Sequence, residues 1–345
     1  MKPFQTKGVP TMKRVIVLYN LAERLEKGVP SDLICEQEIT IIVPLVVELL
    51  KKRGYQVEAL KADLNLWEEL KARKGSFDIV FNLAEAFGGG NTNETVVPAM
   101  LEGLSIPFTG ASLGNMSLIL DKEKTKLVLA PYGIPTAQHV LFRTGREVLN
   151  GLGFPLIVKP IKEEASIGIY SDCVVNNEAD LLRKVLDSLA KYKQPIMAER
   201  FIRGREISVG VVGNLPDIHV FPPLEFLFEG ATSELEKIRS YEYKWGGKKE
   251  QMVRADLPPQ IIRQLVEYSK ICFEATDCRD YARMDYRIDP ENGIYLLEVN
   301  YNPGIGPNSH GLNNTLTKMA SFEGCSFEDL VERVILVAMQ RYGLA

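Results

Sequence analysis

The sequence lacks the cysteine and histidine patterns that bind zinc or build a disulfide framework. It has five cysteines and three histidines, with no CxxC pair and no Cys/His cluster at zinc spacing. The cysteines are odd in number and scattered, at positions 35, 173, 272, 278 and 325. This pattern predicts buried, reduced thiols in a cytoplasmic protein.

The sequence also lacks a long apolar run and a strong charge excess. No stretch of about 18 apolar residues is present, which excludes a membrane span, and the polar N-terminus has no apolar secretory segment. Lys and Arg number 41 against 45 Asp and Glu, for a net charge of −4. Because nucleic-acid binders usually carry a basic face, we expect neither nucleic acid nor membrane as a partner.

Two common nucleotide-binding motifs are missing as well. The absence of GxxxxGK[ST] disfavours a P-loop enzyme. No G-x-G-x-x-G follows the first predicted strand, which disfavours a dinucleotide-binding fold.

The order of predicted elements indicates an α/β protein. After a loose leader at 1–12, the first domain (13–111) opens with the apolar, β-branched run at 14–19, typical of a strand buried on both faces. Strands alternating with helices predict a doubly wound parallel sheet. The other elements expected here are a helix ending at Gly54 and strands at 56–60 and 78–83.

Two α+β domains follow, at 112–202 and 203–345. In the first of these, the link between strands 155–160 and 168–175 is too short for a crossover helix, so we expect an antiparallel hairpin. The other elements expected are helices at 122–130, 177–191 and 259–275, strands at 137–142, 195–200, 205–213 and 217–222, a long charged stretch at 229–253, two strands around a turn at 289–293, and a last helix starting at Ser326 with a capping-box-like pattern.

Four polar residues flank the turn at 289–293. Side chains two apart on a strand share a face, so Arg283 goes with Asp285, and Glu298 goes with Asn300. If 290–293 form the turn, 289 pairs with 294 and Asp285 lies opposite Glu298. Two carboxylates and an amide oxygen suit Mg²⁺ held together with substrate phosphates. The alternative is an exposed sheet face with ordinary ion pairs.

Lys159 and Glu199 give weaker signals. Lys159 ends an apolar run and needs an anionic partner, for which a nucleotide phosphate and a neighbouring carboxylate are equally suitable. Glu199 closes a strand ahead of Phe201 and Ile202, where it would bind an adenine amine or lie at a domain hinge.

In order along the chain, a set of short motifs resembles the ATP-grasp superfamily and, within it, the D-alanine–D-alanine ligases. Each motif is weak alone, but their common order is specific, and the resemblance runs from about residue 13 to the C-terminus. The motifs are Pro107-Phe-Thr-Gly110 with Asp121-Lys122, Ile157-Val-Lys-Pro160, Met197-Ala-Glu-Arg-Phe-Ile202 with Glu206, Arg283-Met-Asp285, and Leu297-Glu-Val-Asn300 with Asn302-Pro-Gly304.

The resemblance implies a three-domain fold that clamps ATP between the central and C-terminal domains. It implies that a carboxylate is phosphorylated and that an amine then attacks the acyl phosphate to give an amide. The nucleotide-binding residues it implies are Lys122, Lys159, Ser166, Glu199, Phe201, Ile202, Glu206 and Lys244. The others are Asp285, Glu298 and Asn300 for two Mg²⁺ ions (or Mn²⁺), Arg283 and the Gly304 N–H for the oxyanion, and Glu38 for the first amino group. The charged stretch at 229–253 would be the mobile lid.

Several positions depart from the family pattern. Glu85 stands where these ligases usually have histidine, and Trp245 replaces the tyrosine of the lid. The phosphate loop reads Glu163-Glu-Ala-Ser-Ile-Gly168 in place of E-G-S-S-x-G, and Ser309-His-Gly-Leu312 replaces S-H-S-L. The nucleotide and metal positions of the family are kept while several of its amino-acid positions are not, so ligation is expected and its product is open.

D-Ala–D-Ala is the leading expectation for the product, with a role in peptidoglycan supply, and another amino acid, a dipeptide or a natural-product acid is the alternative substrate. A non-catalytic nucleotide-binding module and an ATP-grasp kinase or carboxylase are alternative functions. The related ligases are commonly homodimers, which makes a homodimer an expectation here.

Overall fold

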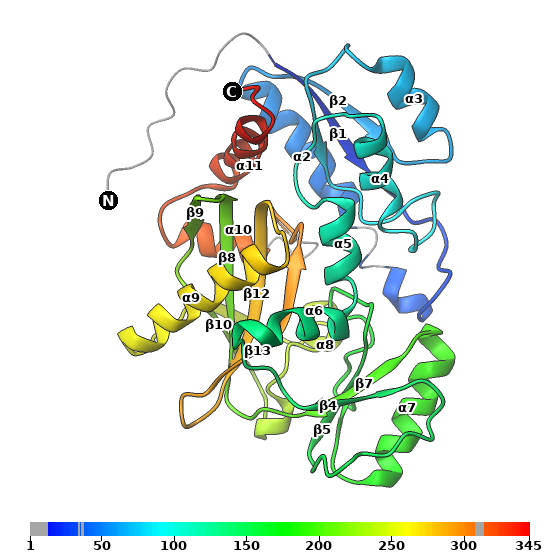
Figure 1. The fold of residues 1–345 in the computed structure, drawn as a ribbon, viewed down its shortest axis with the longest axis vertical. Helices are drawn as coiled ribbons and strands as arrows, with labels where there is room; N and C mark the ends of the chain where they lie inside the picture. Colours follow the sequence, from blue (N-terminus) through cyan, green and yellow to red (C-terminus); the bar gives the residue numbers. More distant parts are fainter. Residues whose placement is uncertain (1–12, 34, 36–37, 308–313) are drawn as a thin grey trace.

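Three β-sheets organise the residues that the structure describes, and each is built from a different part of the chain (Figure 1). The computed structural model describes residues 13–33, 35, 38–307 and 314–345, so the leader at 1–12 and the segment Ser309–Leu312 lie outside the described residues. Its mixture of sheets and helices confirms the predicted α/β class. Each sheet lies within one of the three predicted domains, whose boundaries stay predictions.

The N-terminal sheet is parallel, with strand order β2-β1-β3. Its elements are β1 (Arg14–Tyr19), η1 (Pro30–Asp32), α2 (Ile39–Lys52), β2 (Gln56–Lys61), α3 (Leu66–Arg73), β3 (Ile79–Asn82) and α4 (Val96–Gly103). Val15 and Val17 pack on the side of α2, whereas Ile16 and Leu18 pack with α3 and α4. β1 is therefore buried on both faces, as its apolar run predicts.

The helix α2 ends where the sequence predicts. Lys51 and Lys52 occupy its last turn, and Gly54 takes a φ of 90°, in the left-handed region that favours glycine. The start of α2 places Glu38 at its N-cap.

The central sheet is antiparallel, with strand order β4-β7-β5-β6. Its elements are β4 (His139–Phe142), β5 (Leu156–Pro160), β6 (Val174–Val175), α7 (Glu178–Tyr192) and β7 (Ile196–Arg200). The side chain of Asn177 accepts a hydrogen bond from the backbone of Asp180 and so caps α7. Before this sheet, α5 (Leu113–Ile119), α6 (Lys122–Leu129) and η2 (Ala130–Tyr132) connect it to the N-terminal part.

The C-terminal sheet has the order β11-β10-β8-β12-β13, and β9 pairs with β8. Its elements are β8 (Arg205–Asn214), β9 (Asp217–Val220), β10 (Leu224–Phe228), β11 (Glu250–Arg254), β12 (Asp280–Ile288) and β13 (Ile294–Tyr301). One face packs with α5, α6 and α9 (Pro259–Ala275), and the other with α10 (Thr315–Ser321) and α11 (Phe327–Arg341). The bounds of α9 and the capping box of Ser326 and Asp329 at α11 match the sequence predictions.

The strand predicted at 168–175 is mostly wrong. Only Val174–Val175 is extended, and it pairs antiparallel with β5 as expected for a hairpin. The residues before it form turns, because Ala165 and Ser166 take left-handed φ values of 54° and 63° and the Cys173 thiol donates to the Gly168 carbonyl.

The turn between β12 and β13 also differs from the prediction. Ile288, not residue 289, pairs with Ile294, because the carboxylate of Asp289 accepts backbone hydrogen bonds from Glu291 and Gly293 and so belongs to the turn. A β-bulge at Leu297 then restores the predicted pairing of the residues beyond it.

The charged stretch at 229–253 is folded and contacts both other parts of the molecule. It contains η3 (Glu234–Glu236), α8 (Tyr241–Lys244) and most of β11. The backbone N–H of Tyr241 donates to the Ile169 carbonyl and its hydroxyl to the Ser31 carbonyl, each at 2.7 Å. Trp245 Nε1 donates to the Ala165 carbonyl at 2.9 Å.

Across the described ranges, none of the helices combines the length and the apolar character needed to cross a membrane.

Candidate active site

Four polar side chains meet on one face of β12 and β13. The register pairs Arg283 with Asn300 and Asp285 with Glu298. Arg283 Nη2 donates to Asp285 Oδ2 at 2.8 Å, and Asn300 Nδ2 donates to the same oxygen at 2.9 Å. The β-bulge at Leu297 lies between this group and the turn, so it does not disturb the alternation of side chains within the group. The shared face that this alternation predicts is therefore present.

Cations compensate both carboxylates of this face. Lys122 Nζ, at the start of α6, lies 3.1 Å from Glu298 Oε2. Burial alone would raise the pKa of Asp285, but Arg283 and the hydroxyl of Ser208 stabilise the carboxylate and hold its pKa below the ordinary value. Both carboxylates therefore face cationic groups at close range.

This donor set fits Mg²⁺ that is shared with a nucleotide. In the parts of the chain that the structure describes, no group of three or more His, Cys, Asp or Glu side chains is placed to hold a metal ion. Mg²⁺ usually takes one or two protein carboxylates and completes its octahedron with waters and substrate phosphates. Asp285, Glu298 and the amide of Asn300 match that requirement and do not form an all-protein cage.

A second group buries two lysines against one glutamate. Lys126 and Lys159 each contact a different oxygen of Glu199, and all three side chains are at most 5% exposed. Although burial opposes ionisation, the two lysines lower the pKa of Glu199 to about 2. The pKa of Lys126 is lowered by burial and by the charge of Lys159. With both lysines protonated, the group holds one positive charge in excess, which favours a nearby anion.

The sequence left a nucleotide phosphate and a neighbouring carboxylate as candidate partners of Lys159. In the structure, a carboxylate is its partner. Lys159 is held by Glu199, a residue that the sequence singled out separately.

Phe201, Ile202 and Glu206 lie where the central sheet passes into the C-terminal one. Phe201 and Ile202 are buried, with the Arg287 guanidinium 5.0 Å from the Phe201 ring centre. The Glu206 carboxylate accepts a hydrogen bond from the Arg239 backbone at 3.3 Å and lies 3.6 Å from Arg287 Nη2. Burial raises the pKa of Glu206 to about 6 even though Arg287 favours its ionised form.

The loop at 163–168 is bonded to the charged stretch. Ser166 Oγ donates to the Arg239 carbonyl at 2.8 Å. Burial raises the pKa of Glu164 to about 8, and the charge of Glu85 adds to this effect, whereas Lys122 opposes it. Glu164, which stands in place of the glycine of the family pattern, therefore lies close enough to Glu85 for their charges to interact.

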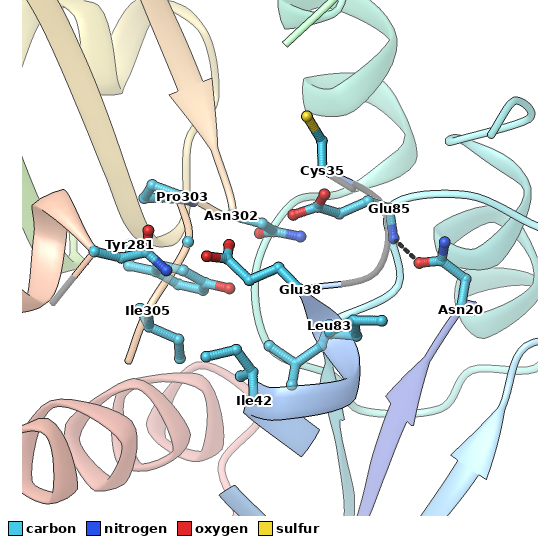
Figure 2. Close-up of a pocket in the computed structure, with 13 residues that line it drawn as sticks. Asn20, Cys35, Glu38, Ile42, Leu83, Glu85, Tyr281, Asn302, Pro303 and Ile305 are labelled. Carbon is cyan, nitrogen blue, oxygen red and sulfur yellow. Dashed lines mark hydrogen bonds between the residues drawn. The ribbon is translucent and has the colours of Figure 1, made fainter. Parts of the chain in front are cut away.

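A pocket between the N-terminal and C-terminal parts contains Glu38 and Gly304 (Figure 2). The carboxylates of Glu38 and Glu85 both turn toward Asn302. Glu38 Oε1 is buried without a hydrogen-bond partner among the described residues. The rest of the lining is Asn20, Cys35, Ile39, Ile42, Leu83, Tyr281, Pro303, Ile305 and Asn314.

Lys244 lines a second pocket that shares Glu38 and Asn314 with the first. Burial and the nearby charges of Arg239 and Arg283 lower its pKa, and Glu38 opposes this shift. Lys244 Nζ lies 5.2 Å from the Trp245 ring centre, so the residue that replaces the expected tyrosine packs beside it.

Sequence reasoning missed Lys126, Arg287 and Arg239. Lys126 lies four residues after Lys122 on one helix, and Arg287 lies two residues after Asp285 on one strand, so spacing was an available signal for both. No spacing on a helix or strand pointed to Arg239, because it lies in the irregular part of the charged stretch.

Comparisons with known proteins place these features in a family context. Residues 128–336 match the family described as D-ala D-ala ligase C-terminus. The D-alanine–D-alanine ligase of Carboxydothermus hydrogenoformans is 30% identical over 308 residues, covering 86% of this chain and 91% of that protein. The uncharacterized protein y4sG of Sinorhizobium fredii is 32% identical over 315 residues, covering 87% of this chain and 88% of its own.

A solved structure shares the fold. The D-alanine–D-alanine ligase from Bacillus anthracis complexed with ATP superposes with a TM-score of 0.72 at 21% identity, covering 96% of this chain and 99% of that one. The predicted ATP-grasp architecture is confirmed by this likeness.

Proposed function

Because this chain belongs to the D-alanine–D-alanine ligase family and is thus an ATP-dependent amino-acid ligase, we propose that it joins the carboxylate of one amino acid to the amine of a second amino acid or short peptide. The observation that carries the proposal is the shared face of Arg283, Asp285, Glu298 and Asn300 beside Lys122. A carboxylate and a triphosphate brought to this face would meet both cations and metal donors.

Each group of residues would bind a different part of the nucleotide or of the amino-acid substrates. Lys122, Lys159, Ser166 and Lys244 would hold the phosphates, and the excess positive charge of the Lys126–Lys159–Glu199 group supports this. Glu199 and Glu206 would bind the adenine edge and the ribose, with Phe201 and Ile202 beside the base. Glu38 would bind the first ammonium group, and Arg283 with the Gly304 N–H would stabilise the oxyanion.

Two displacements complete the proposed reaction. An oxygen of the first carboxylate attacks the γ-phosphorus of ATP, and ADP leaves. The amine of the second substrate then attacks the acyl carbon, the carbon–oxygen bond to phosphate breaks, and the amine loses one proton as the amide forms. The chain's own contribution is to position the groups, neutralise charge and exclude water from the acyl phosphate.

Two Mg²⁺ ions, or Mn²⁺, would be held by Asp285, Glu298 and Asn300. When bound, they supply positive charge to the phosphate oxygens.

The cellular setting is part of the same proposal. With D-alanine as both substrates, the product would serve peptidoglycan synthesis, as implied for the relatives named D-alanine–D-alanine ligase. All five cysteines are free thiols, in keeping with the cytoplasm. We include a homodimer in the proposal, to be checked by light scattering.

The first test is ADP and phosphate release from Mg²⁺-ATP, screened against single and paired amino acids of both configurations, with mass spectrometry of the products. We expect ADP release that depends on an amino acid, together with a product that has lost one water relative to its substrates. A phosphorylated or carboxylated product, or ATP binding with no amino acid stimulating turnover, would contradict the proposal.

Removal of divalent ions gives a second prediction. Excess EDTA is expected to lower ADP formation by about 10³-fold, because the phosphate charge loses its counterions. Adding Mg²⁺ or Mn²⁺ beyond the EDTA concentration should restore the rate, whereas Na⁺ at equal ionic strength should not. ADP formation that continues in EDTA would remove the metal from the proposal.

A further inference from the structure

A buried arginine, Arg287, lies on the same face of β12 as Arg283 and Asp285, because side chains two residues apart on a strand share a face. The neighbouring strand β8 places Glu206 directly opposite Arg287 and Ser208 directly opposite Asp285. One face of the C-terminal sheet therefore runs from the carboxylate proposed for the metal to the carboxylate proposed for the ribose. Arg287 lies at the ribose end of that face.

Arg287 joins β12 to two other segments of the chain. Its Nη1 atom donates to the Gly204 carbonyl at 2.9 Å, and its Nη2 atom donates to the Lys237 carbonyl. Gly204 belongs to the link between β7 and β8, whereas Lys237 belongs to the charged stretch at 229–253. The guanidinium carbon also lies 5.0 Å from the ring centre of Phe201, which begins the same link. A single buried side chain thus contacts both segments that border the proposed nucleotide site.

The link approaches β12 closely enough for this contact because residue 204 is a glycine. Gly204 has a φ of 120°, and a β-carbon at this position would lie 2.1 Å from the Ile288 carbonyl oxygen. Any other residue would push the link away from β12 and so away from the Arg287 guanidinium.

Glu206 is held between Arg287 and the charged stretch. Its Oε2 atom lies 3.6 Å from Arg287 Nη2 and accepts a hydrogen bond from the Arg239 backbone N–H at 3.3 Å. Burial raises the pKa of Glu206, and the charge of Arg287 is the strongest of the effects that oppose this shift. In the described part of the chain both contacts are made by Oε2, which leaves Oε1 to accept a hydroxyl group.

We propose that Arg287 is a positioning residue for the ribose site: it orients the Glu206 carboxylate toward a ribose hydroxyl and, through Lys237, ties that orientation to the charged stretch. The inference rests on the proposed function, in which Glu206 binds the ribose of ATP. Without the guanidinium, Glu206 loses this cation and the charged stretch loses its hydrogen bond to β12.

Nucleotides that lack one ribose hydroxyl test this role in the full chain. ATP is compared with 2′-deoxy-ATP and 3′-deoxy-ATP by measuring kcat and KM for amino-acid-dependent ADP release. Calorimetry with ADP and its two deoxy forms measures binding. Because a hydrogen bond to a charged group is lost with the hydroxyl, we expect wild type to prefer the ribonucleotide to at least one deoxy form by about 20-fold in kcat/KM and in Kd.

The variant Arg287→Met keeps much of the side-chain length and removes the guanidinium. We expect the KM for ATP to rise by about tenfold, kcat to stay within about threefold, and the preference for the ribonucleotide to fall to about twofold. Arg287→Gln should give the same result, and it carries the test if the methionine variant does not fold. Arg287→Lys keeps a positive charge beside Glu206 and should recover a preference of about tenfold.

The control variant Arg53→Met makes the same substitution at the end of α2. It breaks ion pairs of Arg53 with Asp329 and Glu332, each at 2.7 Å, in a part of the molecule that has no proposed contact with the nucleotide. We expect wild-type kcat, KM and nucleotide preference in this variant. A general loss of stability would not by itself change the preference between two nucleotides, so the comparison isolates positioning from folding.

The outcomes separate this inference from the proposed function. Ligated product together with a ribonucleotide preference that survives in Arg287→Met or Arg287→Gln would keep the function and overturn the positioning role. Equal use of ATP and both deoxy forms by wild type would overturn it as well. A preference for ADP over a deoxy form that is lost in Arg287→Met, without any ligated product from wild type, would support the positioning role and overturn the proposed function.

Discussion

Replacing Asp285 by asparagine is expected to lower the rate of ADP formation by about 10³-fold. The substitution keeps the shape of the side chain and removes the charge that Arg283 and the proposed metal share. Asp285 also has the central position of the face, because Arg283, Asn300 and Ser208 all donate to it. Single-turnover ADP release at saturating ATP is the measurement.

Two comparisons make this result interpretable. Asp217→Asn changes an exposed aspartate of β9 and should leave the rate unchanged. Ser208→Ala removes one donor to the same carboxylate and should cost about tenfold, the effect of an outer partner on a ligand. If Asp285→Asn folds normally by circular dichroism and still forms ADP at the wild-type rate, this face is not the site of phosphoryl transfer.

Replacing Glu199 by glutamine is expected to lower the free energy of unfolding by about 3–5 kcal/mol. The substitution leaves Lys126 and Lys159 buried with no carboxylate to share, and burying an uncompensated ammonium group is costly. Denaturation in urea is the measurement. The surface variant Glu58→Gln breaks an exposed pair and should cost at most about 1 kcal/mol.

The same group predicts a direction for the pH dependence of stability. The pKa of Glu199 is lowered from 4.5 to about 2 in the folded chain, so its contribution is present above pH 4.5 and is lost as the pH falls toward 2. A shift of this size corresponds to about 3 kcal/mol. Glu199→Gln should therefore lose less stability than wild type between these pH values. An equal loss of stability in both proteins would show that the pKa of Glu199 is not lowered in the folded chain.

The shared face of β12 and β13 that carries Asp285 and Glu298 was predictable because it depends on a local rule. Side chains two residues apart on a strand share a face, and the turn at 289–293 is recognisable from its residues, so Asp285 and Glu298 were placed opposite one another from the sequence. The starts of α7 and α11 and the end of α2 were predictable for a similar reason, since the caps Asn177 and Ser326 and the terminal Gly54 act within a few residues.

Local rules could point to Lys126 through its spacing from Lys122, but they could not predict that Lys126 and Lys159 share Glu199. Lys126 meets Glu199 only because α6 packs beside the central sheet, a contact between residues 73 positions apart. The apolar run that ends at Lys159 indicates that this lysine needs an anionic partner, but it does not identify that partner. The turns at 168–173 were missed because distant partners fix them, such as Tyr241, whose backbone N–H donates to the Ile169 carbonyl.

The β-bulge at Leu297 makes the hairpin tolerant of a one-residue change in length. Tyr286 pairs with Leu296 on the turn side of the bulge, and Asp285 pairs with Glu298 on the other side. A deletion of Leu297 would join these two registers into one regular ladder, with every side chain still on its present face. The loss of Leu297 during evolution would therefore leave the carboxylates in place, whereas a deletion of Val299 would turn Glu298 or Asn300 to the opposite face.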